Sequence, residues 1–202
     1  MIRLRKDVLV IEPAGEEAGP LRDWLAAHVG KVFWLRESKD KTLIFHSLGD
    51  RADACREPLN ITSRSRGSLN LISNFAATPF VLDEQGYASI EGFWQGLKFP
   101  ADDDRRRLAG LAGSEAKDAG YYAPPADHII YLGQDVRVGT WDHWRLMERA
   151  CSAKFEQHAA AREALLSTGT RPLVHQTKPD SRSIPGVIMA DIWMRLRERH
   201  RT

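Results

Sequence analysis

The segment Ser89-Ile-Glu-Gly-Phe-Trp-Gln-Gly-Leu-Lys-Phe99 decides how the rest of the chain is organised. Its apolar residues recur at i, i+3, i+4 and i+7, which is one face of an α-helix: Ile90, Phe93, Trp94 and Leu97. Ser89 is suited to cap the helix, because its hydroxyl can accept a hydrogen bond from a first-turn N–H. We therefore predict a helix that begins directly after Ser89.

A polar stripe runs along the same predicted helix and holds Glu91, Gln95 and Lys98. Glu91 falls in the first turn, where the helix dipole favours a negative charge. Gly92 and Gly96 each cost a helix about 1 kcal/mol relative to alanine, which suggests that something approaches the backbone closely. Two interpretations stay open: a solvated face of an ordinary amphipathic helix, or a site built on the Glu91 carboxylate.

The composition indicates one globular domain, or one domain with an appendage, in 202 residues of which 43% are hydrophobic. A formal net charge of +2 is too small to indicate nucleic-acid binding by overall charge, but it is compatible with a local basic groove. Cys55 and Cys151 form neither a disulfide nor a metal pattern, which favours buried thiols in a reducing compartment. Because no segment resembles a signal peptide or a membrane span, we expect a cytoplasmic protein without membrane contact.

Residues 1–66 are predicted to form an N-terminal β-containing extension packed on the core. Short apolar runs predict strands at Asp7–Glu12, Lys31–Arg36 and Lys41–His46, the last two joined by a hairpin loop. A short helix is predicted between Gly19 and Gly30. The turn that carries Arg64 and Arg66 can hold a phosphate, or it can be an ordinary solvated loop.

The remaining residues, 67–202, are predicted to be mostly helical, which makes the fold class α+β and predominantly α-helical. A strand over Thr78–Asp83 is expected to enter a turn in which Gly86 takes a positive φ. Periodicity and charge order predict helices at Asp102–Leu108, Gly113–Gly120, Trp141–Gln157 with a continuation to Leu166, and Val187–Arg199. An ordered loop is predicted at Tyr121–Asp127, and short strands at Ile129–Leu132 and Pro172–His175.

Several well-known catalytic motifs are absent from the sequence. There is no Gly-x-Gly-x-x-Gly, no Walker-type loop, no paired zinc-ligand spacing and no Gly-x-Ser-x-Gly. His175 on its short apolar run fits a half-buried histidine with a hydrogen-bond partner better than a ligand. We therefore expect neither a metal nor a cofactor, and the best site candidate from the residues alone is Glu91 surrounded by aromatic side chains.

Several blocks of the sequence resemble, in the same order, the signature of the NADAR family, the YbiA-like N-glycosidases. The main blocks are Ser73-Asn-Phe75, Pro79-Phe80, Ser89 to Phe99, Trp141-Asp142, Ala153-Lys-Phe155, Leu165-Leu166, Thr168-Gly169 and Leu173-Val174. The resemblance implies a YbiA-like helical core, with residues 67–202 as the N-glycosidase domain. It also implies hydrolysis of a ribose C1′–N bond without a metal.

The resemblance further implies roles for single residues. Glu91 would be the catalytic carboxylate, which stabilises positive charge on the sugar and orients or deprotonates water. Lys98 and the helix N-terminus are expected to keep Glu91 ionised at neutral pH. The family pocket places Asn74, Trp141 and Asp180 against the substrate, and the same pocket is expected to include Phe75, Trp94, Gln95, Lys98, Arg64 and Arg66, the two arginines holding a diphosphate.

The form of the key helix resembles family members that remove ADP-ribose from guanine bases as antidotes to ADP-ribosyltransferase toxins. Expected partners are ADP-ribosylated nucleic acid or a nucleotide-like small molecule, and a cognate toxin. The chain departs from the family after Asp180, where it lacks the usual Trp-Gly pair, and at Gly92, where His or Ala is common. Three alternatives stay open: riboflavin-pathway intermediates as substrates, a non-catalytic ADP-ribose or nucleotide-binding module, and a protein that only binds a partner.

Overall fold

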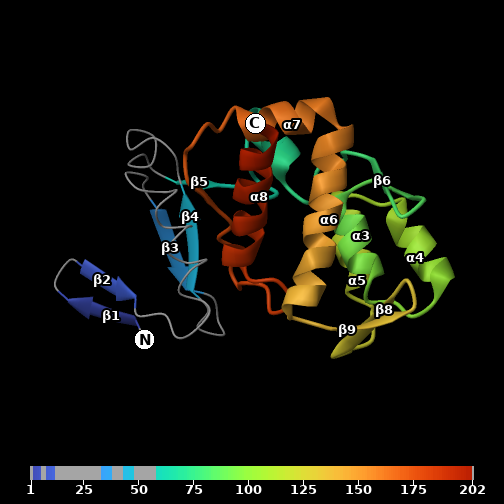
Figure 1. The fold of residues 1–202 in the computed structure, drawn as a ribbon. Coiled ribbons are helices and arrows are strands. Elements are labelled where there is room, and N and C mark those ends of the chain that lie inside the picture. Colours follow the sequence, from blue (N-terminus) through green and yellow to red (C-terminus); the bar gives the residue numbers. More distant parts are fainter. Residues whose placement is uncertain (1, 6–7, 12–32, 38–42, 48–57, 202) are drawn as a thin grey trace.

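A group of helices forms the body of the protein. The computed structural model describes residues 2–5, 8–11, 33–37, 43–47 and 58–201. Within them, α6 (Trp141–Gln157) lies beside α8 (Gly186–Arg201), and α7 (Ala159–Leu166) contacts both (Figure 1). The next group of helices is centred on α3 (Ile90–Gly96), which packs against α6, α4 (Asp102–Ala109) and α5 (Gly113–Gly120). The 3₁₀ helix η2 (Gly67–Ile72) contacts α7.

Short strands pair two by two around these helices. The antiparallel pairs are β1 (Ile2–Arg5) with β2 (Val8–Ile11), β3 (Phe33–Glu37) with β4 (Leu43–Ser47), β6 (Phe80–Leu82) with β7 (Gln85–Tyr87), and β8 (His128–Tyr131) with β9 (Gln134–Arg137). One parallel pair joins β5 (Leu59–Asn60) to β10 (Leu173–Val174). The predicted fold class, α+β and predominantly α-helical, is confirmed.

The core is built from the apolar faces of α3, α6 and α8. Its most deeply buried large side chains include Phe93, Met147, Phe155, Ile192 and Trp193, each no more than 1% exposed. Burying one such side chain contributes about 1.5–3 kcal/mol to the free energy of folding. Because these residues recur at helical spacing, their burial determines which face of each helix turns towards the core. Among the described residues, no helix is long and apolar enough to cross a lipid bilayer.

The helix predicted after Ser89 is present as α3. Ser89 Oγ accepts a hydrogen bond from Gly92 N at 2.9 Å, which confirms the predicted cap. A Cβ on Gly92 would lie 2.5 Å from the carbonyl oxygen of Leu108 and 2.6 Å from that of Leu111, so the predicted close approach is confirmed there. The same prediction is wrong for Gly96, where the nearest atom would be at an ordinary 3.7 Å.

The turn before α3 differs from the prediction. The residues with positive φ are Asp83 (49°) and Glu84 (66°), whereas Gly86 lies inside strand β7. Two such residues between antiparallel strands form the tight turn that matches the strand twist. The structure also adds β7 between this turn and α3, and the strand β9, neither of which was predicted.

Other predicted elements agree with the structure at the level of whole segments. The strands predicted at Lys31–Arg36 and Lys41–His46 are β3 and β4, and they pair antiparallel. The long predicted helix is divided at His158, whose extended backbone ends α6 and whose imidazole accepts a hydrogen bond from Ala161 N to cap α7. The helix predicted between Gly19 and Gly30 lies outside the described residues. The division into 1–66 and 67–202 stays a prediction.

Candidate active site

Glu91 is fixed in place by bonds at both its backbone and its side chain. Its N–H donates to the carbonyl oxygen of Asn74 at 2.9 Å, which ties the first turn of α3 to the Ser73–Phe75 segment. Its Oε1 accepts a 2.7 Å hydrogen bond from Nε2 of Gln95, one helical turn further along. The Glu91 side chain is 7% exposed. The polar stripe of the sequence is therefore not a solvated face.

Glu91 lines a cavity of about 390 Å³, called here the Glu91 cavity. This volume lies within the roughly 300–1,000 Å³ that is typical of ligand pockets. Its walls come from α3, α5, α6, the start of α8 and the segments around residues 63, 73–75 and 175–184. The structure brings together on these walls the predicted residues Asn74, Phe75, Glu91, Trp94, Gln95, Lys98 and Asp180.

Burial raises the pKa of Glu91 above its ordinary value of 4.5. The hydrogen bond from Gln95 and the charges of Lys98 and Lys117 lower that pKa, but they do not outweigh the loss of hydration. Lys98 lowers the pKa of Glu91 as expected, but loss of hydration is the larger effect, and ionisation of Glu91 at neutral pH stays a prediction. A carboxylate with a raised pKa is a better proton acceptor, and this property is common in catalytic sites.

The ammonium of Lys98 is itself half-buried. Burial lowers its pKa and the nearby Glu91 raises it, so the two groups titrate under each other's influence. Lys117 of α5 is exposed, with Nζ 5.8 Å from the centre of the Phe75 ring. The ion pairs of the described residues do not involve either lysine. Both positive charges are thus available to an anionic ligand.

We expect Lys98→Met to move the acid limb of the kcat/KM profile to higher pH. Lys98 lowers the pKa of Glu91, so its removal raises that pKa further and a higher pH is needed to ionise the carboxyl. The measurement is kcat/KM against pH for the hydrolysis of a ribose C1′–N bond, the reaction that the family resemblance implies. Arg107→Met on the exposed surface of α4 is the control. An acid limb that stays in place or moves to lower pH would contradict this coupling.

Two cavity-lining residues each carry a buried acceptor that lacks a hydrogen-bond partner within the described residues: Asn74 Oδ1, and Gln95 Oε1, which packs against Gly120. The amide nitrogen of Asn74 faces the sulfur atoms of Met189 at 3.3 Å and Met147 at 3.9 Å, which are weak acceptors. An unpaired buried acceptor costs about 1–3 kcal/mol.

Asp180 lines the cavity and also binds the N–H of Gly186, the first residue of α8. Its Oδ1 accepts hydrogen bonds from Ser181 N and Gly186 N, both at 2.9 Å. A Cβ on Gly186 would lie 1.8 Å from the carbonyl oxygen of His175, so only glycine fits there. Backbone donors thus hold one oxygen of Asp180, which is exposed, whereas Glu91 is buried and is therefore the better candidate for proton transfer. His175 is half-buried, and its Nδ1 lies 2.6 Å from Ile61 O, as its interpretation from sequence predicted.

Trp94 separates the Glu91 cavity from an adjoining apolar cavity of about 320 Å³. Its ring stacks on His143, with centroids 4.3 Å apart. Burial lowers the pKa of His143 to about 4, so this imidazole is neutral at physiological pH. The two cavities also share Lys98 and Ser183. A polar space next to an aromatic-lined apolar one suits a ligand with both a sugar and a base.

Three predicted site residues do not line the Glu91 cavity. Trp141 at the start of α6 is 46% exposed and packs edge-on against Trp144. Trp144, three residues further along α6, is buried in the core, whereas Trp141 at the first position of the helix lies at the surface. Arg64 and Arg66 are exposed in the turn after β5, and only the neighbouring Ser63 reaches the cavity wall. Their proposed contacts with substrate stay predictions without support from this geometry.

Lys154 holds the segment next to Asn74 in place, and this role was not predicted from the sequence. Its side chain is fully buried, and Nζ donates to the carbonyl oxygens of Ser73 at 2.9 Å and Ile72 at 3.3 Å. These carbonyls end η2, directly before Asn74, whose own carbonyl holds Glu91 N. Burial lowers the pKa of Lys154 to about 8. Lys154 is thus a positioning residue for the Asn74–Glu91 contact.

We expect Lys154→Met to lower the free energy of unfolding by about 1–3 kcal/mol at pH 7, because two buried carbonyls lose their donor. The pKa of Lys154 is lower in the folded chain, so the wild type gains stability as the pH rises from about 8 towards the unfolded value of 10.5. Methionine does not titrate, and the deficit of the variant should therefore widen over that range. Urea unfolding at pH 7 and pH 10 measures it; a constant deficit would contradict the buried ammonium.

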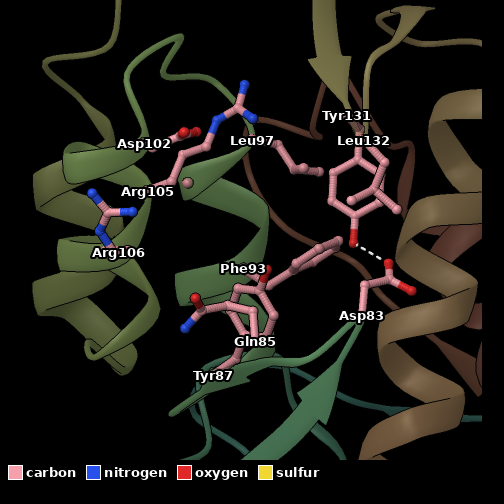
Figure 2. A pocket seen from close by; sticks show the side chains of 11 residues that line it. Asp83, Gln85, Tyr87, Phe93, Leu97, Asp102, Arg105, Arg106, Tyr131 and Leu132 are labelled. Carbon is pink, nitrogen blue, oxygen red and sulfur yellow. Dashed lines mark hydrogen bonds between the residues drawn. The ribbon is translucent and has the colours of Figure 1, made fainter.

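A further cavity of about 190 Å³ (Figure 2) is lined on α3 by Phe93, Gly96 and Leu97, none of which lines the Glu91 cavity. Several of its polar groups already have protein partners: Asp83 accepts from Tyr131 Oη and pairs with Arg149, each at 2.5 Å. Arg105 donates to the carbonyl oxygens of Phe99 at 2.6 Å and Ile130 at 2.8 Å. These bonds join the β6–β7 turn, α4 and α6 to β8. The cavity thus has a structural explanation, whereas the Glu91 cavity has unpaired polar atoms.

No group of three or more His, Cys, Asp or Glu side chains that could hold a metal ion is found in the described part of the chain. The polar side chains next to Glu91 carry amides, ammonium groups and hydroxyls, which are not a typical set of metal ligands. Reaction without a metal stays a prediction.

Comparisons with known proteins agree on one group. The model of the family described as bacteriophage protein GP30.3 matches residues 68–186. An uncharacterized 17.1 kDa protein from the Gp30–rIII intergenic region of Enterobacteria phage T4 is 42% identical over 78 residues, which are 37% of this chain and 51% of that protein. N-glycosidase YbiA of Escherichia coli K12 is 28% identical over 114 residues, 54% of this chain and 64% of YbiA.

The fold also has a solved counterpart. The NMR structure of the E. coli protein YbiA superimposes with a TM-score of 0.53 at 24% identity, over 75% of this chain and 90% of that one. The chain spans between half and two thirds of the length of the curated relatives it matches. The likeness to the solved structure therefore concerns the fold, and activity is a separate question.

Proposed function

Because the chain belongs to the family of bacteriophage protein GP30.3, we propose that it is an N-glycosidase that hydrolyses a ribose C1′–N bond with Glu91 as its carboxylate. Its homology to YbiA also confirms the resemblance to the NADAR family. The observation that carries the proposal is a buried carboxylate, oriented by Gln95 and flanked by two ammonium groups, on the wall of a cavity large enough for a ligand.

The geometry suits a reaction that passes through a positively charged sugar. As the C1′–N bond breaks, its electron pair leaves on the base nitrogen and the ribose takes on oxocarbenium character. A fixed carboxylate beside C1′ stabilises that charge without reorganising. The water oxygen then bonds to C1′, and one of its protons passes to Glu91 before it is returned to the base or to solvent. The raised pKa of Glu91 favours this acceptance of a proton.

For the substrate, we propose ADP-ribose attached to a guanine base of nucleic acid. Lys98 on the cavity wall, outside the ion pairs of the described residues, suits a diphosphate. The adjoining apolar cavity beside Trp94 suits a base that stacks on an aromatic ring. A role in reversing the modification made by a cognate toxin follows from this substrate and belongs to the same proposal.

The proposal is tested by incubation with an oligonucleotide that carries ADP-ribosylated guanine and, separately, with the riboflavin-pathway intermediate, with products identified by mass spectrometry. We expect free ADP-ribose and an intact guanine in the first reaction, with and without EDTA. Product only from the riboflavin intermediate would keep the N-glycosidase and overturn the substrate. Binding of ADP-ribose with no product from either compound would overturn the enzyme and favour a binding module.

A further inference from the structure

We infer that Tyr121 and Tyr122 form a stacking surface for the unpaired nucleotides that flank the modified one. The two rings are the most exposed large hydrophobic side chains of the described residues, at 85% and 80%. Exposed aromatic residues of this size are unusual next to a polar cavity unless they bind something. The inference rests on the proposed function, and it specifies that the substrate is a single strand rather than a free nucleotide.

The backbone that carries the two tyrosines is well fixed. Tyr121 N donates to Asp118 O at 3.1 Å and Tyr122 N to Ala119 O at 3.4 Å, which continues the last turn of α5. Pro124 and Pro125 follow directly and restrict the next part of the loop. The rings meet edge to face, with centroids 5.9 Å apart and planes at 88°. Two outward rings on a restrained turn lose little entropy when a base stacks on them.

The tyrosines belong to a shallow hollow that continues from the Glu91 cavity. The hollow has a volume of about 470 Å³ and is lined by Gln95, Lys98, Lys117, Asp118, Tyr121 and Tyr122. The first three of these residues also line the Glu91 cavity. A strand whose modified nucleotide lies at Glu91 would therefore pass over this hollow as it leaves the cavity.

The charge of the hollow fits a phosphate backbone. It contains two ammonium groups, of Lys98 and Lys117, against the single carboxylate of Asp118. Positive side chains that follow the backbone, combined with aromatic rings that accept any base, are the usual means of binding single strands. A duplex presents base edges rather than base faces, so the two rings would gain nothing from it. A protein partner is the competing occupant, and the test separates it.

The test compares the wild type with the double variant Tyr121→Ala/Tyr122→Ala. Fluorescence anisotropy measures binding of an unmodified single-stranded DNA oligonucleotide, and kcat/KM is measured on modified guanosine and on the same unit within an oligonucleotide. We expect the variant to lose about tenfold or more in oligonucleotide affinity and in kcat/KM on the oligonucleotide, since stacking is worth about 1–3 kcal/mol per base. Because Tyr121 also lines the apolar cavity beside Trp94, the nucleoside is measured with Tyr122→Ala, whose kcat/KM on the nucleoside should be unchanged.

Two further variants sharpen the result. Tyr121→Phe/Tyr122→Phe should behave as the wild type, because stacking uses the ring and not the hydroxyl. Ile130→Ala, which removes another half-exposed apolar side chain on β8, should leave oligonucleotide binding unchanged. Lys117→Gln should reduce the slope of log K against log salt by about 0.7, the value for one phosphate contact on a single strand.

The failures are distinguishable. If the wild type cleaves both substrates and the double alanine variant does so equally well, the stacking surface is wrong and the N-glycosidase stands. Equal binding of duplex and single strand, or an equal loss on nucleoside and oligonucleotide, would also overturn the stacking surface. If the wild type cleaves neither substrate, the proposed function fails, while the anisotropy measurement still decides whether the tyrosines bind a strand.

Discussion

Glu91→Gln is expected to lower kcat by about 10³-fold or more while the protein stays folded. Glutamine has nearly the same shape and can still accept a hydrogen bond from Gln95, so the Ser73–Phe75 segment and α3 should stay in place. It carries no negative charge to stabilise the sugar cation and cannot take a proton from water. The measurement is single-turnover release of base from the oligonucleotide, together with circular dichroism.

The stability of the same variant gives an independent check. Burial raises the pKa of Glu91 in the folded chain above 4.5, the value expected in the unfolded chain. The wild type therefore loses stability as the pH rises from 4.5 to the pKa of the folded state. Glutamine does not ionise, so the free energy of unfolding of the variant should rise relative to that of the wild type between pH 4 and pH 8. Glu115→Gln, at an exposed position on α5, is the matched control and should change neither activity nor this difference. Full activity of Glu91→Gln would remove the basis of the proposed mechanism.

Gly92→Ala is expected to have the largest effect on stability among the substitutions considered, about 3 kcal/mol of unfolding free energy and on the order of 10 °C in Tm. Its Cβ would lie 2.5 Å from Leu108 O and 2.6 Å from Leu111 O, and both atoms belong to backbone that cannot move alone. Relief would require α3 to shift away from the end of α4, and the shift would carry Glu91 with it. Activity should therefore fall together with Tm.

Gly96→Ala is the matched control in the same helix. Its Cβ would have its nearest neighbour, Arg105 O, at 3.7 Å, which is an ordinary contact. Alanine is the better helix former, so we expect the free energy of unfolding to rise by up to about 1 kcal/mol. Thermal unfolding of both variants measures the contrast. Similar destabilisation by both substitutions would show that helix geometry, rather than the approach of Leu108 and Leu111, explains Gly92.

Elements with local signals were predicted well. The helix Gly113–Gly120 and the start and end of Trp141–Gln157 agree with the structure, because periodicity acts over a few residues. Elements that depend on partners far along the chain were not predicted. β9 has little apolar character of its own and is held by pairing with β8. The positive φ at Asp83 is accompanied by bonds from Tyr131 and Arg149, far along the chain.

The residues of the candidate site likewise divide into those that local spacing predicted and those that depend on distant partners. Glu91, Gln95 and Lys98 were placed together by helical spacing alone, and they line one cavity. Lys117 was missed, because nothing in the sequence of a short polar helix indicates that this side chain lines the cavity beside Glu91. Lys154 was also missed, since a lysine on an apolar stripe shows neither its burial nor the carbonyls it meets.

The sequence by itself determined the helix that carries Glu91, its cap at Ser89 and the order of the polar residues along it, because these follow from spacing within one element. Only the tertiary structure decided the protonation behaviour of Glu91. The charges near it in sequence favour ionisation, but the segments that bury it come from Asn74, α5 and the start of α8. Loss of hydration depends on all of these neighbours at once, and no local pattern contains it.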